Sequence, residues 1–330
     1  MLRKLLMVAV TFASVQAPVA ARADCDGTDL RTTLTQAEQA RIEEKLAATP
    51  YAQGNHWVAT RGDQRIDLIG TYHFNAPQFD AIAERLEPVV ATADAILFEV
   101  NAQDTADFQK SLATDLSAVL IVEGPTLPDL MTEDGWDQLS ALGRERGIPA
   151  FVLAKSRPVM LLGALALPGC FEKGPDLEKG LDKRLMQIAS HHNVPQISLE
   201  TVADSFGIFE QDPLEEQAAL LEKMLPQLSD AENQFHTLLT GYLDEDVART
   251  VLTIEASTRR SAPDTAEHDA VSAKFNKRAL TDRNHNWMPV ILRQPGDRLV
   301  IAVGAAHLSG KDGLLHLLEQ QGYTLERAAF

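Results

Sequence analysis

The sequence lacks the signatures of several common enzyme classes. It contains no Gly-x-Ser-x-Gly, no His-Glu-x-x-His and no glycine-rich phosphate-binding loop, which argues against a serine esterase and an ordinary zinc protease. Only two cysteines occur, Cys25 and Cys170, and neither has the neighbours of a catalytic thiol or a zinc knuckle. No low-complexity tract, tandem repeat or interdomain linker is present, so we expect a single domain over residues 24–330.

Positive charge is also scarce. The chain has 30 Lys and Arg against 47 Asp and Glu, a formal net charge of −17. Such a chain repels phosphate backbones and anionic lipid surfaces. Nucleic acid is therefore not an expected partner.

Long hydrophobic runs are absent beyond the N-terminal segment. Within residues 1–23, Arg3 and Lys4 precede an apolar run, and small residues before Asp24 supply a cleavage site. This pattern predicts an export signal and a periplasmic or secreted mature protein. A membrane anchor would need about 20 mainly apolar residues, and this segment is interrupted by Gln16, Pro18 and Arg22. We therefore expect a soluble protein with no membrane anchor after signal cleavage.

The predicted export also bears on the redox state of the two cysteines. An exported chain meets an oxidising environment, in which thiols commonly pair. We expect a disulfide between Cys25 and Cys170, and two unpaired buried thiols are the alternative.

The most informative feature that is present is a matched pair of segments, residues 65–73 and 298–307. Each consists of an arginine, an apolar run suited to a buried strand, and Gly-x-x-His. A short apolar run that ends in glycine is typical of a strand whose end needs backbone freedom or close approach. The histidines of the two copies, His73 and His307, would meet if both strands lie in one sheet and run in the same direction.

The remaining pattern alternates strands and helices. It predicts a hairpin over residues 56–71, further strands at 95–100, 148–153, 196–200 and 299–303, and an edge strand after Gly322. Helical patterns cover residues 35–48, 77–92, 104–120, 132–146, 177–192, 271–292 and 311–321, and residues 205–267 form a helical insertion or cover. The expected fold is α/β, with a mixed, largely parallel central sheet flanked by helices.

Four of the predicted strands end in groups that bind metals or move protons: His73, Glu99, Glu200 and His307. Ligands bind beyond the carboxyl ends of the strands in open α/β sheets, so these groups are expected at one edge. Two imidazoles with one or two carboxylates suit Zn, Mn, Fe or Co and leave room for a nucleophilic water. One glutamate would be a ligand and the other a general base.

Each of these residues also has a simpler explanation. Glu99 would pair with an arginine or face solvent, and Glu200 would cap the following helix. Arg283, on a helix that precedes the His307 strand, could pair with a carboxylate, bind a substrate anion or form only a surface salt bridge.

Taken in order, these motifs resemble the TraB/GumN family, which is related to the Tiki proteins. The resemblance is carried by Gly70 to His73, Phe98-Glu99, Gly180-Leu181-Asp182, Leu199-Glu200-Thr201, Arg283-Asn284, Gly304 to Leu308, and Gly313, Leu314, Leu315, Gly322 and Tyr323. It implies a metal-dependent, hydrolase-like fold with His73, Glu99, Arg283 and His307 at its centre. Tiki members act as Mn- or Co-dependent proteases.

Together these observations predict an exported, metal-dependent hydrolase that cleaves peptide or related amide bonds in a small extracytoplasmic substrate. His73, Glu99 and His307 would bind a divalent transition metal, and Glu99, Glu200 and Arg283 would take catalytic roles. The alternative is a non-catalytic protein of the same family that binds or sequesters a peptide.

Overall fold

The protein is described from a computed structural model that defines residues 27–168, 179–210, 212–262 and 264–330. The predicted signal segment and both cysteines lie outside these described residues. The export signal and the disulfide therefore remain predictions. Within the described ranges, no helix is long and apolar enough to cross a membrane.

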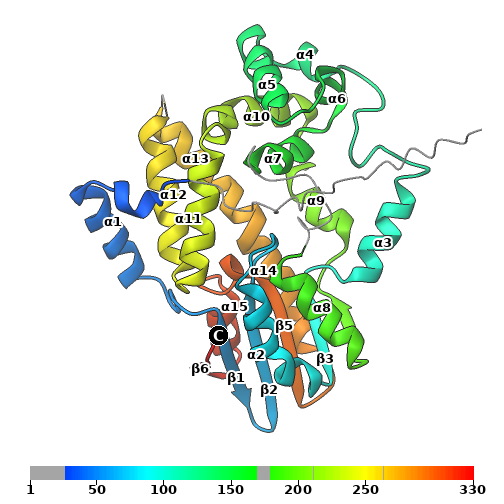
Figure 1. Ribbon diagram of the computed structural model, residues 1–330, viewed down its shortest axis with the longest axis vertical. Helices are drawn as coiled ribbons and strands as arrows, with labels where there is room; N and C mark the ends of the chain where they lie inside the picture. The colour runs from blue at the N-terminus through cyan, green and yellow to red at the C-terminus, as the bar shows by residue number, and fades with distance from the viewer. Residues whose placement is uncertain (1–26, 169–178, 211, 263) are drawn as a thin grey trace, which may run out of the picture.

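A six-stranded sheet forms the centre of the molecule (Figure 1), with the strand order β4-β3-β5-β2-β1-β6. The strands are β1 (His56–Arg61), β2 (Gln64–Thr71), β3 (Ala95–Phe98), β4 (Gln196–Ser198), β5 (Arg298–Gly304) and β6 (Thr324–Arg327). Strands β4, β3, β5 and β2 are parallel, and β1 is antiparallel to both β2 and β6. This confirms the predicted α/β fold with a mixed, largely parallel sheet.

The two copies of the matched segment are neighbours in this sheet. Strands β2 and β5 pair in parallel, with Arg65 opposite Arg298 and Thr71 opposite Gly304. Both strands are buried through most of their length because helices cover both faces of the sheet. The equivalent register brings the two Gly-x-x-His ends to the same edge.

Helices α2 (Phe79–Ala91) and α8 (Leu181–His191) pack on one face of the sheet, and α14 (Arg283–Leu292) and α15 (Leu314–Gln320) pack on the other. Alternate strand residues supply the two cores: Leu68 and Ile301 face α14 and α15, whereas Ile69 and Val300 face α2. The result is a three-layer arrangement of helices, sheet and helices.

A separate helical bundle lies beyond the carboxyl ends of the parallel strands, at the top of Figure 1. It contains α4 (Leu127–Leu130), α5 (Glu133–Glu145), α6 (Ala150–Lys155), α7 (Pro158–Ala166) and α10 (Leu214–Leu228). Their apolar side chains form a core of their own, which includes the fully buried Leu139, Leu153 and Leu221.

One strand prediction was wrong. The apolar run at residues 148–153 enters helix α6 instead of forming a strand. Its Ile148 N–H donates to the carbonyl of Gly143 at 2.7 Å, and Leu153 is buried against Gly143 of α5. A short apolar run fits a helix or a strand equally well, and here the neighbouring helix decided between them.

The other helices are α1 (Gln36–Ala47), α3 (Ala102–Ser111), α9 (Val202–Glu210), α11 (Ala231–Leu243), α12 (Val247–Ser261) and α13 (Thr265–Asn276). Helix α1 begins with a capping box formed by Thr35 and Glu38, whereas α3 ends well before the predicted residue 120. The α13 helix continues through one π-helical segment, Lys277–Asp282, directly into α14. Arg283 therefore follows a local change in helix geometry, a feature common near functional sites.

Candidate functional site

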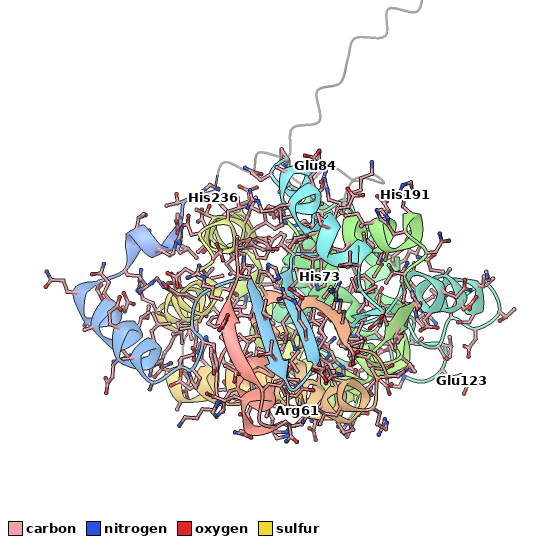
Figure 2. All side chains as sticks on the ribbon, turned by 90° about the horizontal axis from the view of Figure 1, so that it is seen from below. Arg61, His73, Glu84, Glu123, His191 and His236 are labelled. Atoms are coloured by element: carbon pink, nitrogen blue, oxygen red, sulfur yellow. The ribbon has the colours of Figure 1, made fainter. Side chains whose placement is uncertain are left out.

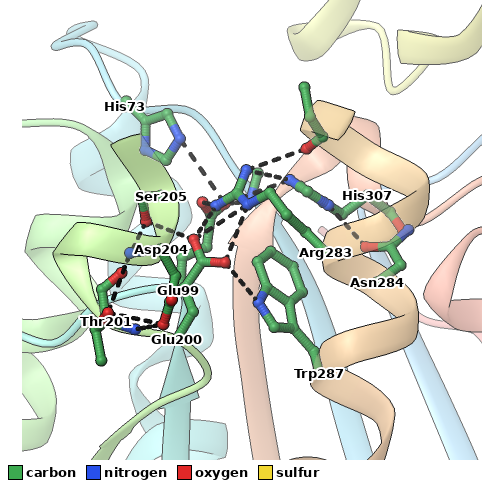
Figure 3. A network of polar contacts seen from close by, with 12 residues as sticks. His73, Glu99, Glu200, Thr201, Asp204, Ser205, Arg283, Asn284, Trp287 and His307 are labelled. Carbon is green, nitrogen blue, oxygen red and sulfur yellow. Dashed lines mark hydrogen bonds and ion pairs between the residues drawn. The ribbon is translucent and has the colours of Figure 1, made fainter. Parts of the chain in front are cut away.

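All five predicted site residues lie close together. Glu200, Glu99, His307 and His73 follow the four parallel strands β4, β3, β5 and β2, in the order in which these strands lie in the sheet. Arg283 enters from the first turn of α14. Figure 3 shows the cluster, and in the view of Figure 2 Glu84, Glu123 and His191 lie by contrast at the periphery of the molecule.

Glu99 occupies the middle of the cluster. Its Oε1 accepts a hydrogen bond from the Gly304 N–H at 2.7 Å and lies 3.9 Å from the Nε2 atoms of both His73 and His307. Its Oε2 accepts a hydrogen bond from Arg283 Nη2 at 2.5 Å. Burial opposes ionisation, but the charges of Arg283 and His73 and the hydrogen bond from the Gly304 N–H outweigh it and hold the pKa of Glu99 well below its usual value. Glu99 is therefore a carboxylate at neutral pH.

The space between the three side chains exists because residue 304 is glycine. A Cβ atom at Gly304 would lie 3.2 Å from Glu99 Oε1 and 3.6 Å from both His73 Nε2 and His307 Cδ2. The backbone of Gly304 has φ −49° and ψ 133°, which any residue can adopt. Its missing side chain, and not its conformational freedom, leaves the centre open.

Gly70, the matching glycine on β2, has a different role. A Cβ atom there would come within 2.9 to 3.0 Å of Ala305 and Leu308. It allows the turn after β5 to pack closely against β2. The two Gly-x-x-His motifs look alike in sequence, yet one glycine serves packing and the other opens the candidate site.

Arg283 joins the two carboxylates. In addition to its bond with Glu99, its Nη2 donates to Glu200 Oε1 at 2.6 Å and its Nε donates to Glu200 Oε1 and Oε2 at 3.1 and 3.2 Å. Trp287 Nε1 donates to Glu200 Oε2 at 3.0 Å, and Ser205 Oγ donates to Glu200 Oε1 at 2.5 Å. The guanidinium is thereby held in one orientation between two acids.

Two of the simpler explanations are wrong. Thr201, and not Glu200, caps the following helix, because Thr201 Oγ1 accepts the Asp204 N–H at 3.1 Å. Arg283 is not a surface ion pair, because its side chain is only 13% exposed. The explanation that Glu99 pairs with an arginine is confirmed, and that arginine is Arg283.

His307 is held in one tautomer by Asn284. The Asn284 amide nitrogen donates to the carbonyls of His307 and Asp312, at 3.2 and 2.8 Å. Asn284 Oδ1 therefore accepts, at 2.7 Å, the proton on His307 Nδ1. The Nε2 lone pair faces the cluster and accepts a hydrogen bond from Arg283 Nη1 at 3.2 Å. Burial lowers the pKa of His307 to about 3, so the imidazole is neutral at neutral pH.

His73 differs from His307 in environment and charge. Its side chain is 54% exposed, and its Nδ1 lies 3.4 Å from Oδ2 of Asp182, on the first turn of α8. Desolvation disfavours its charged form, but the hydrogen bond with Asp182 and the charge of Glu99 outweigh this and raise its pKa to about 9. His73 therefore carries a proton at neutral pH, which it must lose before its nitrogen can bind a metal.

Sequence reasoning assigned no individual role to Asp182, Asn284, Ser205 or Trp287. Asp182 and Asn284 stand within the motifs that carry the family resemblance, so their positions were visible but their partners were not. Trp287 follows Arg283 by four residues, which places both side chains on one face of α14. That spacing was the available signal for Trp287.

The donors suit a transition metal in kind, because the Nε2 atoms of His73 and His307 both lie 3.9 Å from Glu99 Oε1, next to the space over Gly304. Among the described residues, however, no three His, Cys, Asp or Glu side chains are close enough together to hold one ion as they stand. The Arg283 guanidinium lies against Glu99 and His307. The residue types fit a metal, but the side chains of His73, Glu99 and His307 would have to move closer together to bind one.

The fold and the cluster define a class: an α/β protein with imidazole, carboxylate and guanidinium groups gathered at the carboxyl edge of its parallel strands. The chain belongs to the TraB/PrgY/gumN family, whose model matches residues 55–327 and so includes all five site residues. It is similar to a protein of Escherichia coli K12 described as uncharacterized protein YbaP, with 23% identity over 272 residues, 81% of this chain and 94% of that protein. A protein of the same description from Shigella flexneri matches with the same identity and coverage.

Proposed function

We propose that this protein is an exported, metal-dependent hydrolase that cleaves peptide or related amide bonds. The observation that carries the proposal is the convergence of His73, Glu99 and His307 over the open position at Gly304, beside Arg283. A pair of imidazoles with a carboxylate is a recurrent ligand set in hydrolytic metal sites.

In this proposal His73, Glu99 and His307 hold the ion. A divalent transition metal, Mn, Co, Fe or Zn, would supply Lewis acidity that makes water nucleophilic near neutral pH. The lowered pKa of Glu99 keeps it ionised and suits a ligand better than a proton carrier. Glu200 takes the remaining role, as the carboxylate that orients Arg283 or accepts a proton.

Arg283 would stabilise the negative charge that develops on the substrate carbonyl oxygen. Its guanidinium is fixed by Glu200 and stacks over the Trp287 ring, with 4.7 Å between Arg283 Cζ and the ring centroid. A donor that is already oriented needs no reorganisation during the reaction. The half-exposed His73 leaves one side of the cluster accessible to a substrate.

The proposed location is the periplasm or the extracellular medium, with no membrane anchor after signal cleavage. It is supported by the basic and apolar pattern of residues 1–23. The substrate would accordingly be a peptide or another small extracytoplasmic molecule.

The first test is the metal content of the mature protein, purified without chelators or metal-affinity columns. Near-stoichiometric Mn, Co, Fe or Zn is expected in the wild type. It should be lost in His73→Ala and His307→Ala and retained in His192→Ala, whose histidine pairs with Glu87 away from the cluster. A wild type that takes up no metal even after loading with each ion would disprove the metal-dependent proposal.

Substitution of the two glycines sharpens this test. Gly304→Ala places a methyl group among the three donors, so metal loading should fall about tenfold or more while the protein stays folded. Gly70→Ala should instead lower thermal stability, because its methyl group meets Ala305 and Leu308. Equal metal binding by wild type and Gly304→Ala would place the ion elsewhere.

A second candidate is a non-catalytic protein that binds or sequesters a peptide. The observation in its favour is that Arg283 already pairs with both carboxylates and donates to His307. These contacts engage two of the side chains, Glu99 and His307, that would otherwise bind a metal. Stoichiometric binding of a peptide without turnover would support this candidate. Cleavage of the peptide by catalytic amounts of protein, lost in His307→Ala, would support the hydrolase.

A further inference from the structure

The matched segments contain a second pair of residues that the proposed function does not use. Each segment begins with an arginine, and the parallel register places Arg65 opposite Arg298. Residues in register on neighbouring strands point to the same face of a sheet. The pair lies at the amino ends of β2 and β5, roughly 25 Å from the histidines at a strand rise of about 3.3 Å per residue.

The two arginines line a pocket of about 340 Å³. Its polar wall also contains Asp67, and its apolar wall includes Pro88 and Val89 of α2 and Val300 of β5. The pocket thus combines guanidinium groups with hydrocarbon surface.

The pocket is lined by two arginines but only one carboxylate, that of Asp67. Arg65 donates to Asp67 from Nε and Nη2, at 2.8 and 2.9 Å, and Asp67 Oδ1 also lies 2.9 Å from His56 Nε2. The second ring nitrogen of His56 faces the carbonyl of Ala329 at 2.8 Å, an atom that only accepts. The single carboxylate of the pocket is therefore already engaged by two partners.

Arg298 has no such partner. Within the described residues, its guanidinium makes no ion pair or side-chain hydrogen bond, and Asp94 accepts only the backbone N–H groups of Asp297 and Arg298. Like charges placed opposite each other on neighbouring strands repel. On a chain with a net charge of −17, this pair of cations is a local exception.

A purely structural explanation is the negative end of helix α2, which attracts cations. However, the carbonyls of its last turn already have donors: Thr92 Oγ1 donates to Pro88 O at 2.9 Å, and the Ala93 N–H donates to Val90 O at 3.1 Å. The helix end accounts for weak attraction but not for two arginines that share a pocket.

We propose that this pocket binds a small organic oxyanion, a carboxylate or phosphate that carries a short apolar group. The oxyanion would lie between Arg65 and Arg298. The guanidinium of Arg298 would donate paired hydrogen bonds to it, and Arg65, whose Nε and Nη2 are engaged by Asp67, would add its charge and its Nη1 donor. The apolar group would pack against Pro88, Val89 and Val300. Because β2 and β5 end in His73 and His307, the ligand would occupy the opposite ends of the strands that carry the candidate site.

The test is calorimetric titration of the full mature chain at low ionic strength, where charge interactions are least screened. Inorganic phosphate and butyrate are the two probes, and they separate a phosphate ligand from a carboxylate with an apolar tail. Saturable one-site binding of at least one probe is expected. Arg298→Gln should weaken it about tenfold or more, the loss expected for a charge-assisted hydrogen bond.

Arg41→Gln is the matched control, because it removes the same charge from an exposed position on α1. It should leave binding unchanged. Arg298→Lys keeps the charge but loses the paired donors, so its affinity should fall between those of the wild type and Arg298→Gln. The proposal is overturned if neither probe binds saturably to the wild type, or if Arg298→Gln and Arg41→Gln bind equally. Neither outcome bears on the metal test of the candidate site.

Discussion

Asp67 shows how one buried charge depends on its partners. Its side chain is 6% exposed, in the central strand β2, where it contacts His56 and Arg65. Burial acts to raise the pKa of Asp67, but the hydrogen bonds from these two residues outweigh it, and the pKa lies below its ordinary value. A carboxyl group whose pKa is lowered by folding stabilises the folded state above its unfolded pKa, and this contribution is lost as the pH falls through its folded pKa.

We therefore predict a pH-dependent cost for Asp67→Asn. At pH 7 the substitution should lower the free energy of unfolding by about 2 kcal/mol, since it weakens charge-assisted hydrogen bonds. The difference from the wild type should shrink as the pH falls below about 4, the ordinary pKa of an aspartate. Urea unfolding at several pH values measures it. Asp63→Asn, in the exposed hairpin turn, should show no difference, and a cost for Asp67→Asn that stays constant down to pH 2 would contradict the prediction.

At the scale of elements, the start of helix α8 is docked against the end of β2. The Leu181 N–H donates to the Tyr72 carbonyl at 2.9 Å, and the same turn of α8 places the Asp182 carboxylate beside the His73 ring. A Cβ atom at Gly180 would lie only 2.3 to 2.4 Å from backbone atoms of Tyr72 and His73. The backbone of Gly180 is extended, with φ −61°, so space alone requires glycine there.

Gly180→Ala should consequently push α8 away from β2. We expect a loss of about 1 to 3 kcal/mol in the free energy of unfolding, as in other overpacked sites. At the proposed metal centre we also expect weaker metal binding, because Asp182 would move away from His73. Denaturant unfolding measures the first effect and metal titration the second. Gly163→Ala, on α7 where an added Cβ meets nothing within 4 Å, should be neutral or stabilising. Equal stabilities of the wild type and Gly180→Ala would show that α8 is not docked so tightly.

At the scale of the whole molecule, the apolar side chains form separate cores. Two of these cores lie on the faces of the sheet. The third is formed by the bundle of helices α4, α5, α6, α7 and α10. Regions with their own cores can open separately. The candidate site is built on the sheet, so loosening of the bundle should leave its strands intact.

Leu139→Ala tests this separation, since Leu139 is fully buried in the bundle core. The substitution should cost about 2 to 5 kcal/mol within the bundle. Hydrogen exchange followed by mass spectrometry should show faster exchange in α5 and α10 and unchanged protection in β2, β3 and β5. A parallel loss of protection in the strands would mean that sheet and bundle unfold as one unit.

The sequence by itself determined the α/β class, most of the elements and the five residues that meet in the candidate site. This was possible because these signals are local: apolar runs of strand length, capping residues, and polar groups placed directly after strands. Parallel strands bring their ends to one edge of a sheet, so His73, Glu99, Glu200 and His307 were expected at the same edge. The prediction of a strand at residues 148–153 was wrong because a short apolar run is compatible with either a strand or a helix.

Only the tertiary structure decided how these residues interact. It placed β5 between β2 and β3, paired Arg283 with both Glu99 and Glu200, and gave His73 and His307 opposite shifts in pKa. It also separated the role of Gly304 from that of Gly70, which the matched motifs leave identical. The physical reason is that burial, hydrogen bonding and charge depend on neighbours brought in from distant parts of the chain, which local sequence patterns do not specify.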